Sequence, residues 1–160
     1  MAVTTLQELT AQLAPDSRLL GLDVGSKTVG LALSDVTRTI ATPYRTLRRT
    51  TFAKDAERLR RTIDEHGVGG LVIGLPVQMD GTEGRRCQSV RRFAANLLER
   101  MDMPIAFWDE RLSTAAVERV LIREADMSRR RRAQVIDKAA AAYILQGALD
   151  ALAGAAGAAP

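Results

Sequence analysis

The sequence predicts an α/β domain built on a mixed β-sheet. In residues 19–35, two apolar runs flank Val24-Gly25-Ser26-Lys27, which is the pattern of a β-hairpin. A second observation is Val68–Leu75, an apolar run bounded by glycines and Pro76, as is typical of a strand buried on both faces. The segments between such runs carry apolar residues at helical spacing, which predicts helices that cover a partly parallel sheet.

The elements of the first half follow in a simple order. Residues 6–13 carry leucines at the spacing of a short amphipathic helix, which Pro15 is expected to end. Beyond the hairpin, residues 38–47 are expected to be extended, which makes a meander of three strands. Residues 52–66 again have helical spacing, and Gly67 is expected to end that helix before the buried strand begins.

The second half adds a strand and three helices. A helix with one apolar face is expected after Thr82, and Pro104 precedes a short apolar strand at residues 105–110. Further helices are expected at residues 115–124 and at residues 134–152. The complete order predicts a central five-stranded mixed sheet flanked by helices.

The length of 160 residues suits one compact domain that can bury a sizeable core. We expect this domain to occupy residues 18–152. Residues 1–17 are expected to form an accessory segment. Residues 153–160, which are rich in Ala and Gly, are expected to be a frayed or disordered tail.

The charge of the chain favours a polyanionic partner such as a nucleic acid. The formal net charge is +4, and most of the 23 basic residues are arginines, which can form bidentate contacts with phosphate. An abundance of Arg and Ala can equally follow from the base composition of a genome, so composition leaves both interpretations open.

Several classes of site are excluded by composition. Cys87 is the only cysteine, so neither an intramolecular disulfide nor a Cys-rich zinc site can form. His66 is the only histidine and adjoins Gly67 at an expected helix end, which argues against Ser–His and His–metal catalysis. Because the chain shows neither a signal-peptide pattern nor an apolar run long enough to span a bilayer, we expect a cytoplasmic protein without a membrane partner.

Asp23 is the most informative single residue. It lies at the end of the first apolar strand, next to the glycine turn. An ionised carboxylate among leucines costs several kcal/mol unless it is paired, hydrogen-bonded or bound to a metal. Something in the fold is therefore expected to compensate Asp23.

Two acids follow one another where the strand at residues 105–110 ends. Side chains alternate along a strand, so Asp109 and Glu110 lie on opposite faces of the sheet. Only one of them can readily join Asp23, and Arg111 is available to pair with the other.

Asp137 is the third candidate. The helix around it is apolar on nearly every face, and Lys138 projects in another direction because it is only one residue away. Asp137 therefore has no obvious partner nearby in the sequence.

Each acid also has an ordinary structural interpretation. Asp23 could cap a turn, Asp109 and Glu110 could pair with Arg111, and Asp137 could favour a helix dipole. Together, three acids at the ends or starts of buried elements form a set of hard oxygen ligands suited to Mg²⁺ or Mn²⁺. Two such ions about 4 Å apart can activate water and stabilise an in-line phosphoryl displacement.

Four sequence blocks resemble the signature motifs of the bacterial YqgF/RuvX family. They span most of the chain and occur in the family's order, which is far more specific than one glycine motif. The blocks are Gly21-Leu22-Asp23-Val24-Gly25-Ser26-Lys27, Ile73-Gly74-Leu75-Pro76 with Met79-Asp80-Gly81-Thr82, Asp109-Glu110-Arg111-Leu112-Ser113-Thr114, and Asp137-Lys138-Ala139-Ala140 with Ile144-Leu145-Gln146.

The resemblance implies an RNase H-like fold related to RuvC-type Holliday junction resolvases, and a metal-dependent endonuclease. The family is associated with processing the 5′ end of pre-16S rRNA and, for some members, with resolving four-way DNA junctions. Matched residue by residue, Asp23, Glu110 and Asp137 correspond to the family's catalytic metal ligands. Thr28 departs from the pattern, because Arg is common there in the family.

Several residues are expected to contact the substrate. The loop at residues 74–82 joins a buried strand to a helix, where backbone N–H groups and Thr82 can receive a phosphate. Lys27 and Arg111 adjoin the expected metal ligands. Arg129, Arg130, Arg131 and Arg132 form a basic run shortly before Asp137, which favours a phosphate clamp over a merely solvated segment.

Two other classes of function remain open. An Asp-x-Gly hairpin also opens actin-like and Hsp70-like ATPases, although those proteins enclose their nucleotide between two such domains. A catalytically silent nucleic-acid-binding module with the same fold is the other alternative. Phosphate contacts do not distinguish RNA from DNA, and symmetric cleavage of a junction would call for a homodimer, which trimming of RNA does not.

Overall fold

The computed structural model describes residues 3–113 and 129–157, and the side chains of residues 3–111 and 137–154. One sheet of five strands lies at its centre, in the order β3-β2-β1-β4-β5. Strand β1 pairs antiparallel with β2 and parallel with β4, so the predicted mixed sheet is confirmed. The strands are β1 (Arg18–Val24), β2 (Thr28–Ser34), β3 (Ala41–Arg48), β4 (Val68–Leu75) and β5 (Ile105–Asp109).

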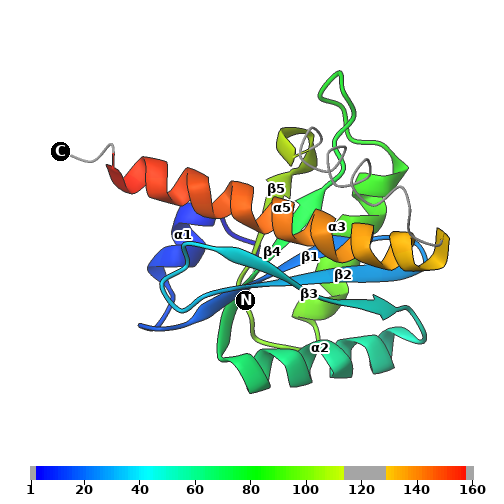
Figure 1. The fold of residues 1–160 in the computed structure, drawn as a ribbon, viewed down its shortest axis with the longest axis horizontal. Coiled ribbons are helices and arrows are strands. Elements are labelled where there is room, and N and C mark those ends of the chain that lie inside the picture. The colour runs from blue at the N-terminus through cyan, green and yellow to red at the C-terminus, as the bar shows by residue number, and fades with distance from the viewer. Residues whose placement is uncertain (1–2, 114–128, 158–160) are drawn as a thin grey trace.

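Helices cover both faces of this sheet, as Figure 1 shows. The long helix α5 crosses one face over β1, β2 and β3, and α1 lies on the same side. Helices α2 and α3 pack on the opposite face. The helices are α1 (Leu6–Ala11), α2 (Phe52–His66), α3 (Arg85–Leu98) and α5 (Arg129–Gly157), with a short 3₁₀-helix η1 (Glu110–Ser113) after β5.

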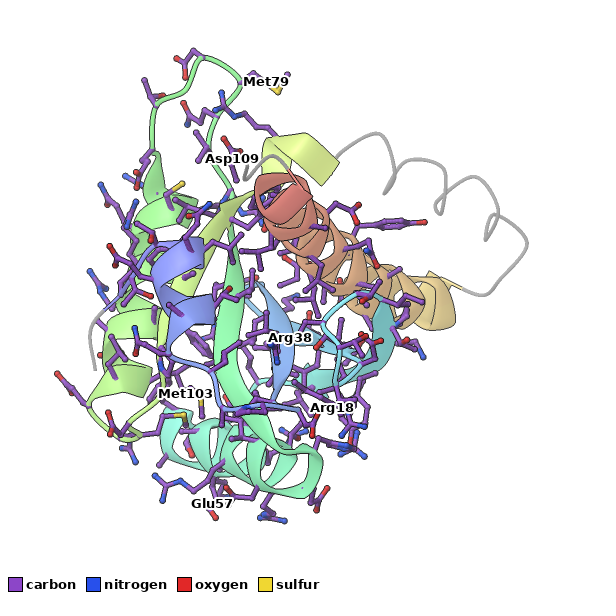
Figure 2. All side chains as sticks on the ribbon, turned by 90° about the vertical axis from the view of Figure 1, so that its left-hand side faces the viewer. Arg18, Arg38, Glu57, Met79, Met103 and Asp109 are labelled. Carbon is purple, nitrogen blue, oxygen red and sulfur yellow. The ribbon has the colours of Figure 1, made fainter. Side chains whose placement is uncertain are left out.

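The strand directions bring several chain segments to one edge of the sheet. Strands β1, β4 and β5 run parallel, so their carboxyl ends meet there together with the start of the antiparallel β2. The loop at residues 76–84 projects from this edge. Figure 2 shows Met79 at the outer part of this loop and Asp109 below it, with Arg18, Glu57 and Met103 toward the other end of the molecule.

The two faces of the sheet differ in the size of their side chains. The face toward α2 and α3 buries large residues such as Leu22, Leu59 and Ile73. The face toward α5 has smaller residues, including Ala32 of β2 and Ala106 of β5. Small side chains let a helix approach a sheet closely, and this approach positions the functional site.

Some boundaries differ from the sequence-based expectation. Helix α5 begins at Arg129 rather than at residue 134 and continues to Gly157, so residues 153–157 are helical where a frayed tail is expected. Alanine is the strongest helix former, which explains this extension. Glu110 belongs to η1 rather than to β5. The helix expected at residues 115–124 lies outside the described residues.

The N-terminal segment docks onto the strand at the edge of the sheet. The backbone N–H of Thr4 donates to the carbonyl of Ile105 at 2.8 Å, and Leu6 and Leu9 are buried beside the sheet. Thr5 and Glu8 form a capping box that starts α1. None of the described helices combines the length and apolar character that crossing a bilayer requires.

Candidate functional site

Three acidic residues from distant parts of the sequence meet at the edge where β1, β4 and β5 end. Asp23 is the penultimate residue of β1, and Glu110 directly follows β5. Asp137 belongs to α5, which crosses one face of the sheet over β1 and β2. Asp23 is half-buried, because the helix and the neighbouring strands surround it.

Two glycines beside Asp23 make room for the other two acids. Gly30 pairs with Asp23 across β1 and β2, and a Cβ atom on Gly30 would collide with the backbone carbonyl oxygen of Asp137. On the other side, a Cβ on Gly74 would lie 2.7 Å from Oε1 of Glu110. Asp137 and Glu110 thus occupy space that side chains at these two strand positions would fill.

The carboxyl groups of Asp23 and Glu110 share a hydrogen bond. Burial, followed by the negative charge of Asp23, raises the pKa of Glu110 to about 7. Burial and the charge of Asp137 raise the pKa of Asp23 as well. Negative charge is therefore concentrated here beyond what the surrounding side chains balance.

Thr28 at the start of β2 holds Asp137. Its hydroxyl donates a hydrogen bond of 2.8 Å to Oδ2 of Asp137, which lies 109 residues further along the sequence. The sequence marks Thr28 only as a departure from the family pattern, yet the structure gives it a role in orienting one of the three carboxylates.

The donor set suits a divalent cation, because all three side chains offer carboxylate oxygens and their mutual repulsion favours a bound positive charge. In the part of the chain that the structure describes, however, no group of three or more His, Cys, Asp or Glu side chains is arranged to hold a metal ion. Asp23 and Glu110 bond to each other, whereas Asp137 bonds to Thr28.

Asp109 lies apart from this cluster, as the alternation along β5 predicts. Nη2 of Arg111 lies 2.6 Å from Oδ2 of Asp109, and this ion pair holds the pKa of Asp109 below its usual range. Trp108 packs with the α5 face, whereas Phe107 packs with the opposite face. The side chain of Arg111, an expected substrate contact, is thus paired with Asp109.

The other residues expected to contact the substrate differ in their hydrogen bonds and exposure. The Thr82 hydroxyl interacts within its own loop. It donates to Asp80 at 2.6 Å, and the side-chain oxygen of Gln78 lies 2.9 Å away. Lys27 is exposed and lines a hollow beside the carboxylates. Arg129, Arg130, Arg131 and Arg132 form the first residues of α5, and their side chains lie outside the described part of the structure.

Two hollows lie next to the acidic cluster, with volumes of about 550 and 470 Å³. The first is lined by Glu110, Arg111 and the loop at residues 76–84. The second is lined by the turn at residues 24–28. Arg86 of α3 lines both hollows and acts electrostatically on both Asp23 and Glu110.

Sequence reasoning did not select Arg86 as a site residue. Its place in a basic, amphipathic helix made it one of several exposed arginines. The available signal is topological: a helix that follows a buried parallel strand starts at the carboxyl edge of the sheet, so its first turn faces the site.

Comparison with known proteins agrees with the fold and identifies the family. The family model RuvX, described as Holliday junction resolvase, matches residues 17–151. A relative from Paramagnetospirillum magneticum is 68% identical over 150 residues, covering 94% of this chain and 96% of its own length. Another from Phenylobacterium zucineum is 58% identical, covering 95% and 98%. Both are provisionally named as pre-16S rRNA nucleases.

Solved structures with little sequence similarity share the fold. The yeast mitochondrial Holliday junction resolvase Ydc2 has a TM-score of 0.58 at 13% identity, covering 96% of this chain and 86% of its own. RuvC of T. thermophilus, solved with a Holliday junction substrate, has a TM-score of 0.53 at 14% identity, covering 86% and 96%. The fold is therefore RNase H-like, and the family match and the close relatives together show that this chain belongs to the RuvX family and is a nuclease.

Proposed function

We propose that this chain is a divalent-metal-dependent endonuclease that processes the 5′ end of pre-16S rRNA. The observation that carries the proposal is the convergence of Asp23, Glu110 and Asp137 at one edge of the sheet. The provisional name of the close relatives supports the substrate. We assign the activity to residues 18–152, with residues 1–17 as an accessory segment, and place it in the cytoplasm.

The three carboxylates are the residues that would hold Mg²⁺ or Mn²⁺, as two ions. Bound there, such cations supply an activated water and stabilise charge on the phosphate that is attacked. Glu110 would bind a cation as the carboxylate, so any proton on it would have to pass to solvent first. Thr28 keeps one oxygen of Asp137 oriented, and Gly30 keeps the backbone of Asp137 close to Asp23.

The substrate is expected to cross the carboxyl edge of the sheet. Lys27 lines the hollow beside the turn at residues 24–28. In this proposal the basic run at the start of α5, which is Arg129, Arg130, Arg131 and Arg132, binds the phosphates of the substrate. Thr82 and Arg111 border the same edge through the loop and η1, where Arg111 is within 3.5 Å of the carbonyl of Gln78. In this proposal these two residues shape the loop that contacts the backbone of the substrate.

The direct test uses an RNA fragment that contains the 5′ leader of pre-16S rRNA, with Mg²⁺ or Mn²⁺. The wild-type chain should cut it, and Asp23→Asn and Glu110→Gln should lower the rate by about 1,000-fold or more, because each removes a charged oxygen ligand. If both variants cut as fast as wild type, the proposed metal site is wrong. Tight ATP binding without cleavage of any nucleic acid would instead favour an ATPase-like module.

A four-way DNA junction is the second candidate substrate, favoured by the description of the matching family model. Symmetric resolution of a junction needs two active sites, so this function calls for a homodimer. The leader RNA and a four-way junction should therefore be compared in one assay, together with the mass of the chain in solution. Cleavage of the junction alone would move the assignment from RNA to DNA.

A further inference from the structure

Arg86 forms the wall between the two hollows beside the acidic cluster. It is the one residue that lines both of them among the residues described. The first hollow continues past Glu110 to the loop at residues 76–84, and the second continues past Thr28 to Lys27. A strand that occupied both hollows would cross Arg86 next to Asp23 and Glu110.

The guanidinium of Arg86 has no hydrogen-bond or ion-pair partner within the described residues. Its neighbours differ: Arg91 on the same helix is held by Glu83 at 2.6 Å, and Arg111 is held by Asp109 at 2.6 Å. Arg86 is exposed, so its five N–H donors are available to a ligand.

The position of Arg86 does not serve the stability of its helix. It lies in the first turn of α3, where the helix dipole favours acidic residues, and that turn contains none. Gly84 at the N-cap provides no side-chain hydrogen bond. A positive charge at this place therefore needs an explanation other than folding.

The acidic cluster provides part of that explanation. Arg86 attracts both Asp23 and Glu110, which counteracts the effect of burial on the pKa values of these two groups. Once cations neutralise the carboxylates, this attraction weakens and the guanidinium can turn to another anion. The anion that the proposed function brings to this place is a phosphodiester.

We propose that Arg86 binds the phosphate group that is cut, with the substrate strand lying in one hollow on its 5′ side and in the other on its 3′ side. The proposal rests on the proposed nuclease function. A guanidinium can hold two phosphate oxygens at once, so it can fix the orientation of the group as well as its place. Nucleotides on both sides of the cut bond should then be needed for cleavage.

The first test compares Arg86→Gln and Arg86→Lys with the matched control Arg92→Gln. Arg92 is an exposed arginine of the same helix that lines neither hollow. On the leader RNA, Arg86→Gln should lower kcat by about 100-fold, as for loss of one donor to the reacting group, with little change in KM. Arg86→Lys should recover part of this loss, and Arg92→Gln should cut like wild type.

The melting temperature of the Arg86→Gln variant tests whether Arg86 has a merely structural role. Because Arg86 opposes the helix dipole, Arg86→Gln should leave the melting temperature unchanged or raise it slightly. A clear fall in melting temperature with a proportional loss of activity would overturn the proposal. A rise in KM with kcat unchanged would do the same, since it would place Arg86 away from the cut bond.

A binding measurement separates failure of this inference from failure of the proposed function. In the Asp23→Asn background, affinity for the leader RNA and for a four-way DNA junction is measured across salt concentrations. Adding Arg86→Gln should reduce the slope of log affinity against log salt by about one, as expected for one lost phosphate contact. An unchanged slope on both nucleic acids refutes a phosphate contact by Arg86 whether or not the chain cuts. Absence of cleavage by the wild type together with a reduced slope refutes the nuclease assignment and leaves Arg86 as a contact to bound phosphate alone.

Discussion

The two faces of the central sheet differ in the size of the side chains that they carry and in how closely helices pack on them. Toward α2 and α3 the sheet carries large side chains such as Leu22 and Leu31, which bury apolar area and stabilise the fold. Toward α5 it carries glycines at positions where a side chain would collide with the helix or with Glu110. The face toward α2 and α3 stabilises the fold by burying apolar surface. The face toward α5 buries less side-chain surface, and its glycines allow the helix to lie close to the strands.

The approach of α5 is continuous along the sheet. A Cβ on Gly21 would lie 2.8 Å from Cβ of Leu145, and a Cβ on Gly74 would lie 2.5 Å from Cδ1 of Ile144. In α5 itself, Gly147 lies against the indole of Trp108, where a Cβ would lie 2.9 Å from Nε1. Close packing of this kind fixes the axial position of α5, and with it the position of Asp137.

The largest effect is expected from adding one methyl group on the α5 face. Gly30→Ala must move α5 away from β2, which should lower the free energy of unfolding by about 3 kcal/mol. A displacement of about 1 Å in a catalytic group can lower the rate by about 100-fold, so activity should fall by at least that factor. Urea denaturation and cleavage of the leader RNA measure the two effects.

The matched control for this change is Gly154→Ala, which adds the same methyl group near the end of α5. A Cβ there meets no atom within 4 Å, so the variant should gain about 0.5–1 kcal/mol from helix propensity and keep full activity. Equal behaviour of the two variants would show that the contact between Gly30 and Asp137 does not position the site.

The opposite face should respond in stability alone. Leu59 of α2 is almost completely buried, and Leu59→Ala should lower the free energy of unfolding by about 3 kcal/mol through loss of apolar contact and the remaining cavity. Below its melting temperature the variant should cut the leader RNA within about threefold of the wild-type rate, because α2 packs on the face of the sheet opposite α5. A loss of kcat as large as that of Gly30→Ala would mean that both faces position the site.

The contrast between the faces also explains what the sequence could predict. Strand periodicity placed Phe107 and Asp109 on one face and Trp108 and Glu110 on the other, and the structure confirms this division. The sequence also predicts the buried strand β4 and the turn at residues 24–27, because both depend on local spacing, and the structure confirms both. Local periodicity thus defines which residues share a face.

Register across strands and the placement of helices were not readable in the same way. That Gly30 lies opposite Asp23 follows from the pairing of β1 with β2, and that α5 lies over this pair follows from tertiary packing. Arg86 and Thr28 acquire their positions beside the acids from the same long-range arrangement. The residues of a single sequence do not distinguish Arg86 and Thr28 from its other arginines and threonines.

Within the site, the stability of the metal-free chain should depend on pH. Glu110 has a pKa of about 7 in the folded state against an ordinary value of 4.5, so the folded chain retains a proton that the unfolded chain loses in this range. Stability should therefore be greatest below about pH 4.5 as far as this group is concerned. It should fall as the pH rises toward 7, by a total on the order of 2 kcal/mol.

Glu110→Gln tests this pH dependence. Glutamine cannot lose a proton, so the variant should be more stable than wild type at pH 8 in EDTA, with most of the difference gone at pH 5. Urea denaturation at both pH values measures it. At pH 8, saturating Mg²⁺ should raise the free energy of unfolding of the wild type. It should have little effect on Glu110→Gln, because the variant lacks one charged ligand. A wild-type stability that rises with pH over this window would contradict the raised pKa.

The smallest effect is expected from the hydroxyl that orients Asp137. Thr28→Val keeps the shape of the side chain but removes the donor to Oδ2 of Asp137, which should lower the free energy of unfolding by about 1 kcal/mol. Activity should fall only several-fold, because Gly30 still holds the backbone of Asp137 in place. The control is Thr37→Val, whose hydroxyl donates at 2.6 Å to Asp35 at the other end of β2 and which should keep full activity. If Thr28→Val instead lost as much activity as Gly30→Ala, the orientation of the carboxylate rather than the close approach of α5 would be the main requirement of this site.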